Sequence, residues 1–134
     1  MTNLIASKLG VSLGEAYNIK SKQGIGYSDN LRDIVPIVKP LLDGLVHEVQ
    51  KVIRYYGDRT SHQHKIAQVI TFGGGANMRG FNEYLAKELG LPTRLLDPWR
   101  QLDFGTLRQP DELSKPMFIT VAGEAILNSE EVFA

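Results

Sequence analysis

The chain has 134 residues, of which 43% are hydrophobic and 22% are charged, and this composition is typical of one folded globular domain. Its 15 basic residues balance its 15 acidic residues, so no nucleic-acid partner is expected. The absence of cysteine excludes disulfides, thiolate metal sites and cysteine nucleophiles. The stretch MTNLIASKLGV is too polar to be a signal peptide or a spanning helix, and no direct membrane insertion is expected.

The first 28 residues predict two short helices. Residues 3–9 form the first, which ends at a glycine. Ser12 and Glu15 have the spacing of a capping box, so the second helix is predicted to begin at Leu13 and to run to about Lys20 or Lys22. Because helices this short bury little surface alone, we expect a small helical subdomain that packs against another part of the protein.

The longest helical period runs through residues 30–57, after a predicted loop at 23–29. Pro36 and Pro40 each remove a backbone N–H and clash one turn back, so a kink or a break is expected in the first half. The best helix is therefore predicted from Pro40 to Tyr56, and Gly57 is expected to end it. The apolar stripe that predicts this helix consists of Leu31, Ile34, Val38, Leu41, Leu45, Val49, Val52 and Tyr56.

The stretch from Ile66 to Gly90 carries most of the functional signal. It predicts a buried strand at Ile66–Phe72, a glycine turn at Gly73–Gly75 and an amphipathic helix at Gly80–Leu89. Consecutive glycines let the backbone approach a ligand closely and adopt positive φ angles. The helix that follows offers unpaired N–H groups, which are suited to an anion or a polar ligand edge.

The remaining segments complete a β-α-β-α pattern. Thr93–Leu96 is predicted to be a second strand, and Pro116–Leu127 a final helix that is apolar almost all round and deeply buried, with Glu124 partly buried in it. Two strands cannot make an independent sheet. We therefore expect a helix-rich α/β fold with an incomplete sheet, whose partner strands belong to a larger protein.

Three familiar motifs fail at the glycine turn. The dinucleotide fingerprint needs a glycine where Met78 stands, and the phosphate loop needs a lysine and a hydroxyl residue where Phe81 and Asn82 stand. The nucleophile elbow needs a serine between its glycines. From spacing alone, a purely structural turn and a ligand-binding turn both remain open.

A family resemblance adds to this reading. The segment ITFGGGANMRGFNEYLAKELGLPTRLLDPW closely resembles the adenosine motif of the actin-like (ribonuclease H-like) ATPase fold, in the type IV pilus assembly PilM branch, which is related to bacterial FtsA. Arg79-Gly80 stands where that family has Pro-Gly. The segments IASKLGVSLGEAYNIK, VIRYYG and ITVAGEAIL resemble further helices of the family in the same order.

The resemblance covers most of the chain and implies the C-terminal portion of such a protein. Residues 1–134 would form a single partial actin-like domain. It would consist of a small helical subdomain (1–28), the long helix (30–57) and the adenosine-motif β-α-β-α unit (66–127).

The resemblance also implies an ATP site, with Mg in the complete protein. Lys20 would be the basic residue near the adenine and ribose. Tyr17 stands where the family has a glutamate and cannot accept from two ribose hydroxyls as a carboxylate does. The implied cofactor-binding residues are Gly73, Gly74, Gly75, Ala76, Asn77, Lys20 and Tyr17, with the adenosine end resting on Gly74, Gly75 and Ala76.

The family's phosphate-binding and catalytic elements precede the matched region. No ATPase activity, no catalytic residue and no bound nucleotide are therefore expected of these 134 residues alone. The complete protein would be a nucleotide-dependent cytoplasmic scaffold, peripheral at the inner membrane, which binds the cytoplasmic peptide of an inner-membrane pilus assembly protein.

An alternative of a different class is an interaction or oligomerisation module that binds no nucleotide. Missing partner strands would leave a sheet edge and an apolar face exposed, so a homo-oligomer is expected. His62 and His64, with His47, are candidate metal ligands, but histidines one residue apart in a polar loop are more often solvated, so no metal site is predicted. An independent enzyme lacks a catalytic constellation.

Overall fold

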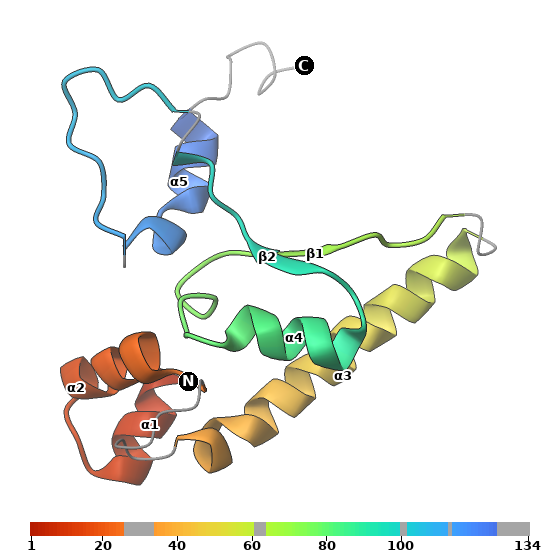
Figure 1. Cartoon of the computed structure of the whole chain (residues 1–134), viewed down its shortest axis with the longest axis horizontal. Coiled ribbons are helices and arrows are strands. Elements are labelled where there is room, and N and C mark those ends of the chain that lie inside the picture. The colour runs from red at the N-terminus through yellow and green to blue at the C-terminus, as the bar shows by residue number, and fades with distance from the viewer. Residues whose placement is uncertain (26–33, 61–63, 100–101, 113, 126–134) are drawn as a thin grey trace.

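The structure is a computed structural model that describes residues 1–25, 34–60, 64–99, 102–112 and 114–125. In Figure 1, the N-terminal helices lie at one end of the long helix α3, and α4 lies between α3 and the two strands. Within these ranges, no helix combines the length and hydropathy that a membrane-spanning segment needs. The elements are α1 (Thr2–Leu9), α2 (Leu13–Asn18), the π-helical turn η1 (Ile19–Gln23), α3 (Val35–Arg59), β1 (Val69–Thr71), α4 (Phe81–Leu89), β2 (Thr93–Leu95), the 3-10 turn η3 (Lys115–Met117) and α5 (Ile119–Ala125).

The two N-terminal helices form where the sequence predicts them. The capping box is present, because the Glu15 backbone N–H donates to Ser12 Oγ over 3.2 Å and the Ser12 N–H donates to the Glu15 carboxylate over 3.3 Å. Helix α1 ends at Gly10, whose φ of 65° is left-handed. Beyond α2 the chain continues as η1, so the helical segment ends at Gln23, one residue past the predicted limit.

Helix α3 is continuous, and the predicted break near the prolines is wrong. Pro36 lies in the first turn, where its missing N–H needs no helical partner, so only Pro40 interrupts the internal bonding. The helix also passes through Gly57, so the predicted stop there is wrong too. It ends at Thr60, whose Oγ1 donates to the Tyr56 carbonyl over 2.9 Å and caps the last turn. Residues 30–33 of the predicted helix lie outside the described residues.

The main core joins the N-terminal helices, α3 and α4. On α3, the buried side chains recur every four residues from Ile34 to Val46. The predicted stripe is therefore mostly wrong, because only Ile34 and Val38 of its described members are buried. Its exposed members are Leu41, Leu45, Val52 and Tyr56, on a side of α3 that no described element covers. The buried residues of this cluster are Ile5, Ala16, Ile34, Val38, Leu42, Val46, Ala76, Met78, Phe81 and Leu85.

A polar cluster fastens α4 to α3 outside this core. The Tyr84 hydroxyl donates to Asp43, which also accepts from Lys39 Nζ over 2.8 Å. The hydrogen bond from Lys39 lowers the pKa of the Asp43 carboxyl, and the bond to Asp43 raises the pKa of Tyr84. Near neutral pH, Lys39 and Asp43 are therefore charged and Tyr84 is neutral.

The two strands pair in parallel, with Val69 opposite Thr93 and Thr71 opposite Leu95. β1 is shorter than the predicted strand Ile66–Phe72, because the ladder extends only as far as β2 runs beside it. The expected full burial of this strand is wrong, since Phe72 is 59% exposed and Ile70 is exposed too. A helix-rich α/β architecture with a small parallel sheet is confirmed.

The predicted final helix divides into η3 and α5, and residues 126–127 of the prediction lie outside the described residues. Its expected deep burial is wrong. Only Ile119 and Ala122 of α5 are buried, against Trp99, while Val121 is 61% exposed and Glu124 is exposed. One face of α5 packs on the loop after β2, and the described elements leave the other face uncovered.

The loop between β1 and α4 is held against the end of η1. The Ile25 N–H donates to the Arg79 carbonyl over 2.9 Å. Gly24 has a φ of +59°, and a Cβ added to it would lie 2.0 Å from the Arg79 oxygen. Both the backbone angle and the close approach therefore require glycine at this position.

The core position Leu42 supplies a first test. Leu42→Ala should lower the free energy of unfolding by about 2–5 kcal/mol, because it leaves a cavity in the main core. Leu42 is 1% exposed, whereas the adjacent Leu41 is 46% exposed, so Leu41→Ala is the matched control and should change stability by less than about 1 kcal/mol. Urea denaturation measures both, and equal losses would contradict the described face of α3.

Gly24 supplies a second test. Gly24→Ala should destabilise the chain by about 1–3 kcal/mol, because the methyl group meets the Arg79 carbonyl in a left-handed backbone. Gly14→Ala in α2 is the control, since a Cβ there meets nothing within 4 Å and alanine favours a helix. Thermal unfolding of the two variants compares them directly, and a fully stable Gly24→Ala variant would refute the steric requirement.

Candidate functional site

The glycine turn is a compact backbone structure between β1 and α4. Gly73 has a φ of 84°, and its N–H donates to the Pro116 carbonyl over 2.8 Å. The Ala76 N–H then donates to the Gly73 carbonyl over 3.1 Å, which closes the turn. The turn is thus tied to η3 at its start and folded back on itself at its end.

One side of this turn is open. A Cβ on Gly73 or Gly75 would meet nothing within 4 Å, whereas a Cβ on Gly74 would lie 3.4 Å from Met117 Cγ. A flat, polar ligand edge therefore has access to the backbone at Gly73 and Gly75, with the half-exposed side chain of Met117 nearby.

The N-terminus of α4 is separate from the glycines. Helix α4 begins at Phe81, and its N-cap Gly80 has a φ of 82°. The chain between Gly75 and Gly80 coils through its own turn, in which the Met78 N–H points to the Gly75 carbonyl at 3.4 Å. The expectation that helix N–H groups add directly to the glycine turn is therefore not supported by this geometry.

Lys20, which the resemblance places near the adenine and ribose, lies against the glycine turn. Its Nζ donates to the Gly74 carbonyl over 2.6 Å, which joins residues 54 positions apart in the chain. The same Nζ lies 5.1 Å from the ring centroid of Tyr17, within the range of a cation–π contact. Three of the predicted site residues are thus brought together.

The Lys20 ammonium is almost fully enclosed. The residue is only 4% exposed, and burial lowers the pKa of Lys20 because it disfavours the charged form. None of the ion pairs in the described part of the chain includes it. Its charge is compensated instead by a carbonyl dipole and an aromatic face.

The other predicted site residues line the same region with different exposure. Ala76 is buried in the main core, and Asn77 is half-buried beside it. Sequence reasoning missed the contacts of Pro116 and Met117 with the turn. Pro116 and the apolar residues after it indicate a helix start, but nothing in the sequence shows that Pro116 and Met117 face residues 73 and 74.

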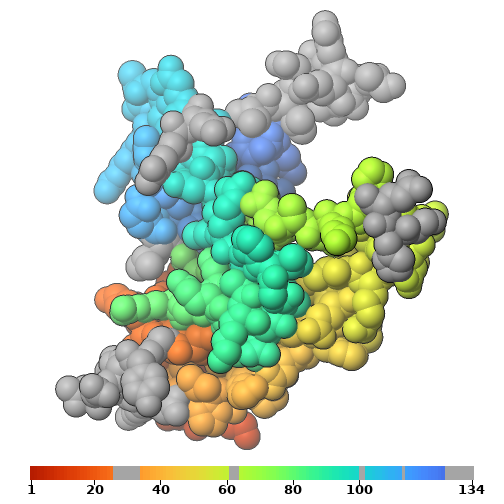
Figure 2. Space-filling model, turned by 45° about the vertical axis from the view of Figure 1, so that its right-hand side comes forward, coloured from red at the N-terminus to blue at the C-terminus, as the bar shows by residue number. Residues whose placement is uncertain are grey.

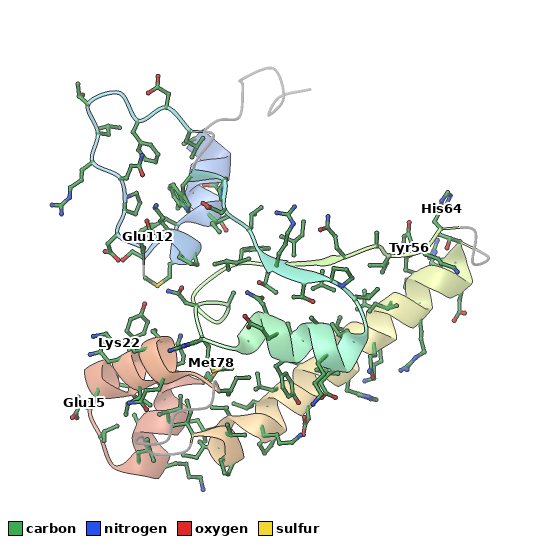
Figure 3. The ribbon with its side chains drawn as sticks, viewed as in Figure 1. Glu15, Lys22, Tyr56, His64, Met78 and Glu112 are labelled. Carbon is green, nitrogen blue, oxygen red and sulfur yellow. The ribbon has the colours of Figure 1, made fainter. Side chains whose placement is uncertain are left out.

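A hollow of about 680 Å³ lies at the C-terminal end of α3, apart from the glycine turn. Figure 2 shows it between the segment that leads into β1 and α3, and Figure 3 places its residues Tyr56 and His64 away from Met78 and the turn. His64 is exposed, and His62 lies outside the described residues. Over the ranges that the structure covers, no group of three or more His, Asp or Glu residues is placed to hold a metal ion.

The buried ammonium predicts a pH effect. A folded-state pKa below the value of 10.5 means that the unfolded chain binds more protons between the two pKa values, so stability rises as the pH is raised through that window. The stability difference between the wild-type chain and Lys20→Met should therefore shift in favour of the wild type toward pH 10.5. Denaturant unfolding at a series of pH values measures it, and a stability difference that stays constant with pH would contradict the lowered pKa of Lys20.

Comparison with known proteins supports the resemblance that the glycine segment carries. A family model described as type IV pilus assembly protein PilM matches residues 1–127. A chain of the solved "PilM-PilN type IV pilus biogenesis complex" has the same fold, with a TM-score of 0.67 and 22% identity over 93% of this chain. The present chain spans 34% of that chain's length. A search of curated proteins finds no match. The chain therefore belongs to the type IV pilus assembly protein PilM family.

Proposed function

We propose that this chain is the C-terminal part of a PilM-type scaffold with the actin-like ATPase fold, and that it carries the adenosine side of an ATP site. The observation that carries the proposal is the hydrogen bond from Lys20 to the Gly74 carbonyl. It fastens the helical unit 1–25 to a glycine turn in which a Cβ on Gly73 or Gly75 would meet nothing within 4 Å.

In this proposal the chain contributes shape and backbone groups rather than charge. Gly73 and Gly75 admit the flat edge of the nucleotide, and Tyr17 offers a ring and one hydroxyl in place of a carboxylate. ATP with Mg would be completed by phosphate-binding residues elsewhere in the protein, because the family's phosphate-binding elements precede the region that this chain resembles. The 134 residues alone would then have no ATPase activity.

The proposed setting is the cytoplasmic face of the inner membrane. The similar solved structure is a complex of PilM with PilN, which supports a partner of that kind, bound through a short cytoplasmic peptide. We assign no residue of this chain to that contact. The role would be nucleotide-dependent assembly of the pilus machinery.

A second candidate is an interaction module that binds no nucleotide. It is favoured by the apolar side chains left uncovered on α3 and beside β1. Exposed apolar surfaces of this kind associate with other protein surfaces, and as an interaction module the chain would form a homo-oligomer. The exposed residues concerned are Leu41, Leu45, Val52, Tyr55 and Tyr56 on α3, with Ile70 and Phe72 at β1.

Titration with MgATP separates the two candidates. The chain extended upstream should bind MgATP in isothermal titration calorimetry, and the 134 residues alone should not. In the extended protein, Gly75→Val should weaken binding by about tenfold or more, because its side chain projects from a position where a Cβ meets no protein atom within 4 Å and so occupies space that the ligand needs. Gly44→Ala on α3 is the control and should leave the affinity unchanged.

Two outcomes would contradict the nucleotide proposal. Unchanged affinity in Gly75→Val would remove the turn from the site. No binding in either form, together with stable self-association in sedimentation, would support the interaction module instead.

A further inference from the structure

The helical unit 1–25 holds the loop between β1 and α4 at two separate points. Lys20 Nζ donates to the Gly74 carbonyl over 2.6 Å, at the start of the loop. The Ile25 N–H donates to the Arg79 carbonyl over 2.9 Å, near its end. Both contacts come from η1 and the residues directly after it, so one short segment holds the loop near both of its ends, in addition to the bond from the Gly73 N–H to the Pro116 carbonyl.

The π-helical turn places Lys20 for this contact. In η1 the Gly24 N–H donates to the Ile19 carbonyl over 3.1 Å, which is the wide bonding pattern of a π-helix. Lys20 is buried against the loop, whereas Lys22, labelled in Figure 3, is exposed on the same turn. Lys20 and Lys22 thus lie on the same turn and have the same chemistry, but only Lys20 is buried and reaches the glycine turn.

The ammonium of Lys20 is committed to the protein. It is 4% exposed, bonded to Gly74 and stacked against the Tyr17 ring. A buried charge is tolerated only where fixed dipoles compensate it, so moving it toward a ligand would break the contacts that justify its burial. Lys20 is therefore bound to the turn itself, at the Gly74 carbonyl.

We propose that Lys20 is a positioning residue that sets the conformation of the glycine turn through the Gly74 carbonyl, rather than a group that touches the ligand. The helical unit 1–25 and the turn then move together, and the ligand affinity of the turn depends on the orientation of that unit. The identity of the ligand rests on the proposed function, whereas the effect of Lys20 on the conformation of the glycine turn does not.

The carbonyl of Gly74 reports the hydrogen bond directly. In nuclear magnetic resonance of the wild-type chain without nucleotide, its ¹³C resonance is read through the Gly75 amide. Lys20→Met should move this resonance upfield and speed amide exchange at Ala76 and Met78 by about tenfold, because a charged hydrogen bond is lost. Lys22→Met, the matched control, should change neither. An unchanged Gly74 resonance in a folded Lys20→Met variant would overturn the proposal.

A measurement on the wild-type chain covers the case in which Lys20→Met does not fold. The Nζ protons of Lys20 should exchange with water at least about tenfold more slowly than those of Lys22, because they are buried and bonded. Equal exchange rates for the two lysines would overturn the proposal on the native protein.

Nucleotide titration of the upstream-extended protein distinguishes positioning from direct contact. Lys20→Met should weaken MgATP binding together with the change in the Gly74 resonance. A loss of affinity with an unchanged Gly74 resonance would make Lys20 a direct ligand and overturn the proposal. If the wild-type protein binds no ATP, the proposed function fails, and the resonance and exchange results still decide whether Lys20 holds the turn.

Discussion

The arrangement of this chain depends on one buried hydrogen bond, from the Lys20 ammonium to the Gly74 carbonyl. The bond joins a helical turn near the N-terminus to a loop in the middle of the sequence. Because the ammonium is enclosed, it needs the carbonyl and the Tyr17 ring in fixed positions. A second hydrogen bond, from the Ile25 N–H to the Arg79 carbonyl, accompanies the close approach of Gly24 to Arg79.

The distribution of exposed apolar surface is the second organising feature. The N-terminal helices and α4 cover the first half of α3, while its second half, the outer face of β1 and one face of α5 remain uncovered. The chain spans 34% of the length of the similar PilM chain, and in the proposed function further parts of such a protein cover these faces. A glycine turn that offers shape without charge is consistent with a site shared between two parts of one protein.

Local signals predicted most of the secondary structure. Ser12 and Glu15 form the capping box that their spacing indicates, and α4 ends at Gly90 as expected. Two wrong predictions, both in α3, also came from local rules. The sequence rules for proline and glycine suggested a break and a stop in α3, but Pro36 falls in a first turn and Gly57 is followed by a capping threonine. Burial of β1 and α5 was overestimated, because hydrophobicity alone does not say which faces have neighbours.

The sequence by itself determined the order of the elements and the glycine turn, since these follow from short-range spacing. The family came from the resemblance of the glycine segment and its neighbours, which the family-model match over residues 1–127 bears out. The resemblance also singled out Lys20 and Tyr17. Only the tertiary structure decided that Lys20 reaches the Gly74 carbonyl, that Met117 lies beside the turn and that Gly24 must lie against Arg79. These contacts join residues far apart in the chain, and their geometry depends on how whole helices pack, which no local pattern specifies.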